Sequence, residues 1–348
     1  MSNFLGHLKT SQWPSLRSHR QILSAGAKGI RSFFSSPYRI GLIVLFTVLF
    51  LPHVFVMVED ISLVGAYEVD PGSIVLSIQS LYQPPHFYNM NVSYHSRFYG
   101  WTYYWISFIL AAPGYILMKL RVVQGYYLFL VSIRLTLFLI GLASLLAFFE
   151  IARRFLKHDL LAFAAGLLYI ASPTVSRFFY FIHPETTGLL FLFLGILCLQ
   201  KFHEQAARDL HWYVLGLLFL VLSVLSKHGF VFIAIPVLFL YLYIYCYHHN
   251  ISMLFFLFSR KFGVVSLASL LLAGLLFFII DPFAFLEPKT FIANQILLFS
   301  TQTHGSATEA EATTAWLNVL GNMPLVSISL ILAPFSSWEQ SFWAPIKQ

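Results

Sequence analysis

Charged side chains are scarce in this chain. Only 10% of its 348 residues are charged, whereas 58% are hydrophobic. A water-soluble fold could not cover that much apolar surface with so few charges, but a lipid bilayer can accommodate it. The composition therefore excludes an ordinary soluble domain and predicts an all-α polytopic transmembrane helical bundle with about eight to ten spans.

Cysteine is also scarce, and the metal-binding motifs are missing. The two cysteines, Cys198 and Cys246, lie in apolar runs and outside any CxxC motif, so nothing supports a disulfide between them. The histidines form no HExxH motif, and their one close pair, His248-His249, falls on the predicted cytoplasmic side. No cofactor is indicated, although a divalent metal could take part. The chain has no internal repeat and no low-complexity tract.

Acidic residues are missing from the N-terminal segment 1–39, whereas basic residues recur along it. An apolar segment from about Ile40 to Val58 follows directly. A basic arm beside a membrane span fits the positive-inside rule better than nucleic-acid binding, so we expect a cytoplasmic N-terminus and no nucleic-acid partner. The arm is too long and too basic to be a cleaved secretory signal.

Most of the chain consists of apolar segments near the length of a bilayer span, about 20 residues. They predict a transmembrane module at 40–335, interrupted by outer loops at 59–102 and 281–316, and a short tail at 336–348. Within the first loop, residues 72–81 have apolar side chains at every third or fourth position, which predicts a short amphipathic helix. After the first span, the apolar segments begin and end near 103–120, 126–149, 160–176, 186–200, 212–226, 230–247, 263–280 and 317–335.

Basic residues indicate how these spans are oriented. Connections at 153–157, 201–208 and 260–261 carry Lys and Arg and are predicted to be cytoplasmic, so the loops at 182–185 and 227–228 share the outer face with the first loop. One region breaks the alternation, because two spans between Tyr103 and Phe149 would leave Arg153 and Arg154 outside. Either one of these two segments does not cross the membrane, or the charge rule fails there.

Candidate catalytic side chains gather on the predicted outer face. Glu68 and Asp70 lie in the first loop, and Arg97 precedes an aromatic stretch. Glu185 opens one span, and Lys227 lies between two others. A carboxylate can accept the proton of an attacking hydroxyl, and Lys or Arg can neutralise a phosphate leaving group. This combination suits the transfer of a group from a phosphate-linked donor.

The order of these motifs resembles the GT-C glycosyltransferases. It is most similar to the branch that contains the protein O-mannosyltransferases and the bacterial aminoarabinose transferases. The similarity extends from about Ile40 to Phe335 and rests on short motifs: an acidic motif in a long first loop, a basic hairpin, an outer Pro-acid pair and a Ser-Lys-x-Gly. The chain departs from the family in having Glu68-Val69-Asp70-Pro71 at the acidic motif and His228 before Gly229. It is also shorter than typical members.

The resemblance implies a role for each candidate residue. Asp70, with Glu68 beside it, would be the catalytic acid of the first loop, and Glu185 the second acid. Lys227 and Arg97 would bind the donor phosphate. The family uses polyprenyl-phosphate sugars and inverts the anomeric centre. The resemblance also implies a protein, lipid or glycan acceptor. The protein would lie in a bacterial inner membrane or an ER-type membrane, with its site on the periplasmic, extracellular or lumenal face.

Each candidate also has a structural explanation. Asp70 could form a turn or cap a helix, Glu185 could stabilise a helix N-terminus, and Lys227 and Arg97 could be interfacial cations. Two other functions remain open as well. A transporter or flippase of a lipid-linked or anionic substrate usually shows repeated halves and charges at mid-membrane, whereas here the charges lie near one face. A non-catalytic accessory subunit of a glycosylation complex would fit the short C-terminus.

Overall fold

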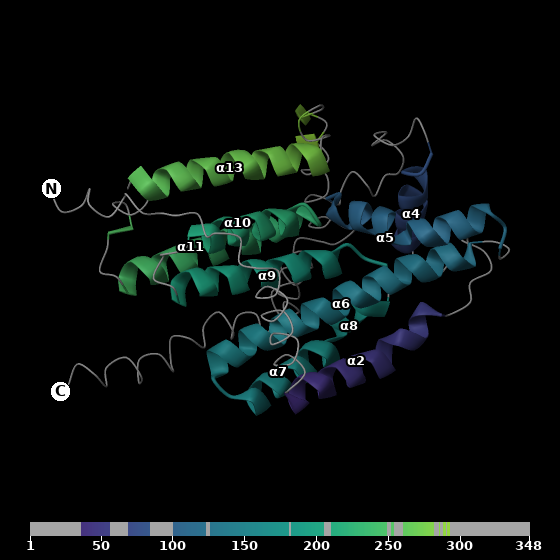
Figure 1. The fold of residues 1–348 in the computed structure, drawn as a ribbon, viewed down its shortest axis with the longest axis horizontal. Helices are drawn as coiled ribbons and strands as arrows, with labels where there is room; N and C mark the ends of the chain where they lie inside the picture. Colours follow the sequence, from purple (N-terminus) through teal and green to yellow (C-terminus); the bar gives the residue numbers. More distant parts are fainter. Residues whose placement is uncertain are drawn as a thin grey trace, which may run out of the picture.

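The chain folds into a bundle of helices (Figure 1). The computed structural model describes residues 36–55, 69–83, 100–122, 126–180, 182–204, 210–248, 252–253, 260–281 and five positions between 285 and 292. For residues 69–73, 248 and 260–261 it describes the backbone only. All the elements in this part of the chain are helical, which confirms the predicted helical bundle. Residues 1–35, Glu68, Arg97, most of the loop at 281–316, the predicted span at 317–335 and the tail lie outside the described residues.

Eleven helical elements are described. Each predicted apolar segment in this part of the chain contains a helix, but the segment predicted at 160–176 is divided into two helices, and the one predicted at 126–149 continues to Leu156. The helix predicted at 72–81 is confirmed as α4. In chain order the elements are α2 (Pro37–Val54), α4 (Val69–Ser80), α5 (Thr102–Lys119), α6 (Tyr127–Leu156), α7 (Asp159–Ala171), α8 (Pro173–Tyr180), α9 (Glu185–Glu204), α10 (Leu210–Val224), the 3-10 turn η4 (His228–Phe230), α11 (Val231–His248) and α13 (Arg260–Ile280).

Five of the described helical segments are long and apolar enough to cross a bilayer. They are α2, α6, α9, the stretch formed by η4 and α11, and α13. The pair α7 and α8 bends by 66° at Ser172 and would make a sixth span if the two are counted together. Neither the 18-residue α5 nor the 15-residue α10 is in this set.

The central element is α6, which has 30 residues. At 1.5 Å per residue it is about 45 Å long, well beyond the hydrocarbon thickness of about 30 Å. Its first part forms an antiparallel hairpin with α5, in which Phe129 packs on Tyr115 with ring centroids 5.7 Å apart. Its second part packs against α2 and α7, where Phe138 meets Phe46 at 5.5 Å.

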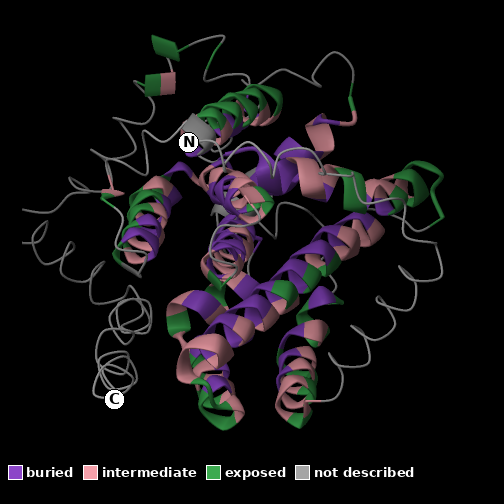
Figure 2. Cartoon of the chain, turned by 60° about the vertical axis from the view of Figure 1, so that its left-hand side comes forward, coloured by how far each residue is buried: buried purple, intermediate pink, exposed green. Residues whose placement is uncertain are grey.

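Three buried apolar clusters hold the bundle together. One joins α4, α5 and the first part of α6. Another joins α2, the second part of α6, α7 and α8. The third joins α9, α10, α11 and the start of α13. Figure 2 shows buried residues on the facing sides of the helices and exposed residues on their outward sides. Many of the outward side chains are large and apolar, as expected for a protein solvated by lipid.

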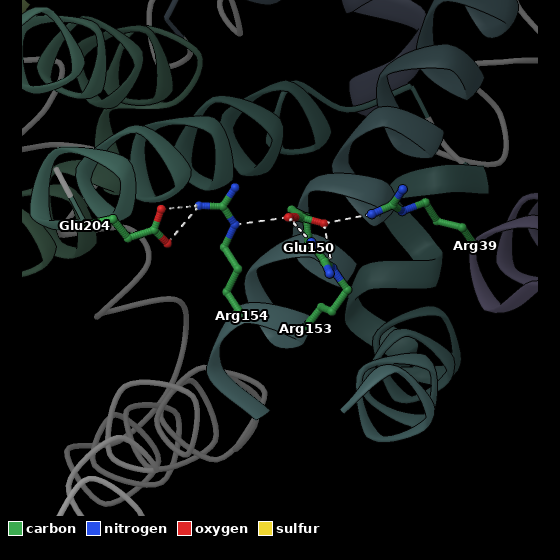
Figure 3. A network of polar contacts seen from close by, with 5 residues as sticks. All are labelled: Arg39, Glu150, Arg153, Arg154 and Glu204. Carbon is green, nitrogen blue, oxygen red and sulfur yellow. Dashed lines mark hydrogen bonds and ion pairs between the residues drawn. The ribbon is translucent and has the colours of Figure 1, made fainter. Parts of the chain in front are cut away.

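One end of the bundle, which we call the arginine end, is defined by Arg39, Arg153 and Arg154 (Figure 3). All three donate to the carboxylate of Glu150: Arg39 at 2.9 Å, Arg153 at 2.8 Å and Arg154 at 3.0 Å. Arg154 also bonds Glu204 at 3.2 Å. These contacts join the start of α2 to the ends of α6 and α9, so the basic hairpin after α6 lies on the same side as the start of α2.

Replacing Glu150 with Gln is expected to destabilise the arginine end. Breaking a buried ion pair costs roughly 3–5 kcal/mol, and the 20% exposure of Glu150 reduces the expected loss to about 1–3 kcal/mol. Thermal unfolding of the purified protein in detergent measures the change. Glu204→Gln is the matched control, since Glu204 is 57% exposed and should cost about 0.5 kcal/mol or less. Equal losses in the two variants would contradict a central role for Glu150.

Candidate functional site

Glu185 is the first residue of α9, at the opposite end of the bundle, which we call the lysine end after Lys227. An acidic side chain is favoured there because the helix N-terminus carries partial positive charge. The carbonyl of Pro184 accepts hydrogen bonds from the backbone of Thr187 at 3.0 Å and Gly188 at 3.1 Å, which starts the helix. The hydroxyl of Thr186 donates to the carbonyl of Phe178 at 2.9 Å and fastens this turn to α8.

Lys227 follows α10 in a short turn that leads into η4. Ser226 donates back to the carbonyl of Leu222 at 2.8 Å, which closes the end of α10. Ser223, one turn earlier, donates to the carbonyl of Gly188 in α9 at 2.8 Å. Since α9 and α10 are antiparallel neighbours, this bond fixes the end of α10 against the start of α9. The two ends bring Lys227 to Glu185.

An ion pair joins the two predicted residues. The ammonium of Lys227 donates to Oε1 of Glu185, and Nδ1 of His183 lies 3.5 Å from Oε2 of the same carboxylate. A buried charge is costly unless it is paired, and the Glu185 side chain is only 9% exposed. Lys227 is 26% exposed, so the cation is more open to an incoming group than the carboxylate behind it.

A second polar pair adjoins the first. Nε2 of His228 lies 3.1 Å from Oδ2 of Asp281, the residue that follows α13. Both side chains are buried, with 10% exposure for His228 and 3% for Asp281. The sequence predicted Asp281 only as the end of a span and did not predict this contact. One indication of it was present in the sequence: both residues lie in loops that were assigned to the same membrane face.

The start of α5 is fastened to the same end of the bundle. The backbone amide of Thr102 donates to the carbonyl of Leu225 at 3.1 Å, and the indole of Trp105 donates to the carbonyl of Ile280 at 3.2 Å. Gly100 lies so close to Leu225 that a Cβ atom would overlap the Leu225 carbonyl. Only glycine permits this approach, which holds the residues after the first loop beside the turn that carries Lys227.

Two tyrosines, Tyr103 at the start of α5 and Tyr82 after α4, are not suited to act as bases. Burial raises the pKa of Tyr103. Burial also raises the pKa of Tyr82 to about 12. Both hydroxyls therefore stay protonated at neutral pH, and proton transfer in this region falls to carboxylates or imidazoles.

Of the five predicted site residues, the structure describes the side chains of two. It brings Glu185 and Lys227 into contact. Asp70 lies in the first turn of α4, and its side chain lies outside the described residues. Glu68 and Arg97 also lie outside them. α4 belongs to this end of the bundle, because Ile74 and Ile78 share a buried cluster with Trp101 and with Ile182, just before His183.

The described residues hold no group of three His, Cys, Asp or Glu side chains that could bind a metal ion. His183 with Glu185 and His228 with Asp281 form two separate pairs within the described part of the chain. The chemistry available there is that of acids, bases and a cation: accepting a proton, orienting a hydroxyl and neutralising an anion.

These features define a polytopic helical membrane protein with acid, base and cation side chains at one end. Residues 129–259 match the family model of dolichyl-phosphate-mannose-protein mannosyltransferases. The match confirms the predicted resemblance to the GT-C glycosyltransferases and supports a membrane glycosyltransferase. It includes Glu185, Lys227 and the basic hairpin after α6. No curated protein and no solved structure matches the chain.

Proposed function

We propose that the chain transfers a sugar from a polyprenyl-phosphate donor to a hydroxyl group of a protein, lipid or glycan, with inversion at the anomeric carbon. The reaction would take place at the lysine end, on the membrane face opposite the basic N-terminal segment. The observation that carries the proposal is the contact between Glu185 and Lys227, two residues predicted separately from different motifs. The family match, which includes both residues, supports it.

Lys227 would bind the phosphate of the donor. When the bond between the anomeric carbon and the phosphate oxygen breaks, both electrons of that bond stay with the phosphate. A cation that is already in place stabilises the charge as it develops. Arg97, from the end of the first loop, would supply a second positive charge.

Carboxylates would act on the acceptor. In a single displacement, the acceptor oxygen bonds to the anomeric carbon on the face opposite the departing phosphate, and its proton passes to a carboxylate. Asp70 is assigned as this base or as the residue that organises the acceptor, and Glu68 is the neighbouring alternative. Glu185 is the second acid, close enough to the phosphate site to share Lys227.

The shared cation has a mechanistic consequence. Before the donor binds, Lys227 is held by Glu185; a bound phosphate would compete for the same ammonium. His183, with Nδ1 3.5 Å from the other carboxylate oxygen, is placed to remain beside Glu185 when Lys227 turns to the phosphate. Donor binding would thereby change the charge balance at Glu185 just before reaction.

The direct test is a transfer assay with membranes that contain the chain. Radiolabelled sugars would be offered on polyprenyl phosphates of different lengths, with nucleotide sugars as the comparison. The proposal predicts label transfer to acceptor from polyprenyl-phosphate donors and none from nucleotide sugars in washed membranes. Donor that crosses the bilayer without transfer would support a flippase instead. If no lipid-linked donor reacts until a second protein is added, the accessory-subunit alternative is favoured.

A further inference from the structure

Asp281 occupies an unfavourable position for a carboxylate. It follows the last turn of α13, where its backbone amide donates to the carbonyl of Phe277 at 2.8 Å. The C-terminus of a helix carries partial negative charge, which repels an anion. Burial adds a desolvation cost, because the residue is only 2% exposed. A carboxylate that is poorly placed on both counts needs a compensating partner.

His228 is that partner. Its Nε2 lies 3.1 Å from Oδ2 of Asp281, and two aromatic rings are near its own ring, with centroid distances of 6.4 Å to Phe277 and 5.1 Å to Phe291. A buried ring held by a hydrogen bond and by two aromatic neighbours has little freedom to rotate. The backbone of His228 is fixed with it, at the start of η4.

The residue fixed next to His228 is Lys227. From adjacent positions in one turn, the side chain of Lys227 reaches Glu185 in α9, and the side chain of His228 reaches Asp281 after α13. The indole of Trp105 also bonds the carbonyl of Ile280, so the end of α13 is itself held in place. The turn is therefore held by two side-chain contacts, one from Lys227 to Glu185 and one from His228 to Asp281.

We propose that Asp281 and His228 form a positioning pair that aims Lys227 at the donor phosphate. The inference rests on the proposed function, because it assigns the phosphate to Lys227. A small displacement of a charged contact can cost a large factor in binding or rate, so a flexible lysine near a membrane surface benefits from a fixed backbone. Neither residue is required to touch the substrate.

The test compares three variants of the full-length purified protein in lipid nanodiscs. His228→Leu removes the hydrogen bond to Asp281, and His228→Gln keeps an amide donor near the position of Nε2. Asp281→Asn keeps the shape and removes the charge. Two quantities are measured: the Kd for a short-chain polyprenyl phosphate without sugar, and kcat and KM for the sugar-loaded donor. The unloaded lipid phosphate reports binding independently of transfer.

For His228→Leu we expect a Kd and a donor KM raised by roughly tenfold or more, with kcat within about twofold of wild type. His228→Gln should recover most of the affinity. If His228→Leu does not accumulate in the membrane, the same Kd and KM measurements on Asp281→Asn test the proposal. A raised KM is again expected. A purely structural role predicts another pattern, in which less active protein lowers the maximal rate and leaves Kd and KM unchanged.

That second pattern would overturn the inference, as would wild-type Kd and KM in His228→Leu or Asp281→Asn. In either case the proposed function stands, provided that the wild-type protein binds the lipid phosphate and transfers sugar. If the wild type neither binds polyprenyl phosphate nor transfers sugar, the proposed function fails, and the positioning role fails with it.

Discussion

Replacing Lys227 with Met is expected to lower kcat/KM for the lipid-linked donor by roughly a hundredfold to a thousandfold. The change removes the ammonium that we assign to the phosphate and keeps an unbranched side chain of similar length. In free energy, the expected loss is about 2.7–4 kcal/mol of transition-state stabilisation. Labelled-sugar transfer at several donor concentrations, with protein amounts matched, gives the value.

Two control variants make the Lys227 result specific. Lys201→Met makes the same change near the arginine end, where Lys201 lies over the ring of Trp212 at 4.2 Å, and should leave kcat/KM near the wild-type value. The double variant with Lys227→Met and Glu185→Gln leaves no carboxylate at position 185 without its cation, and its kcat/KM should be well below that of Glu185→Gln alone. Retention of wild-type kcat/KM by Lys227→Met would remove Lys227 from the phosphate site.

Replacing Glu185 with Gln should separate binding from catalysis. Gln has nearly the same shape, cannot accept a proton under these conditions and no longer holds Lys227 as an ion pair. We expect kcat to fall by roughly a hundredfold if Glu185 takes part in the chemistry. The donor KM should fall as well, because the ammonium of Lys227 is released for the phosphate.

Glu204→Gln is the matched control for this change, since Glu204 ends the same helix and pairs with Arg154 at the other side of the bundle. It should leave both kcat and KM unaltered. An unchanged kcat in Glu185→Gln would show that Glu185 only stabilises the N-terminus of α9 and holds Lys227. A raised KM would contradict the competition between Glu185 and the donor phosphate.

The helices could be predicted from the sequence because long apolar segments have few alternatives in a bilayer. Whether the α5 segment forms a membrane span could not be predicted. Its apolar segment has the length of a span, yet α5 is not among the helices that are long and apolar enough to cross a bilayer. The uneven charge around Arg153 and Arg154 was the signal that one segment differed.

The candidate site was predictable in part for a similar reason. Two antiparallel helices with a short connection place the start of the first beside the end of the second, so Glu185 and Lys227 were bound to be near one another once α9 and α10 were assigned. The contact between His228 and Asp281 depends on how α13 packs against α10. No local pattern encodes that packing.

The measurement that tests the central claim most directly is sugar transfer by the wild type and by Asp70→Asn at matched abundance, with a polyprenyl-phosphate donor. Asp70 lies in the first turn of α4, which packs at the lysine end. If this end is the active site and Asp70 acts on the acceptor, the variant should lose at least roughly a hundredfold in rate, about 2.7 kcal/mol of barrier. Equal transfer by both proteins would contradict the catalytic assignment of Asp70, and absence of transfer by the wild type with every lipid-linked donor would contradict the proposed function itself.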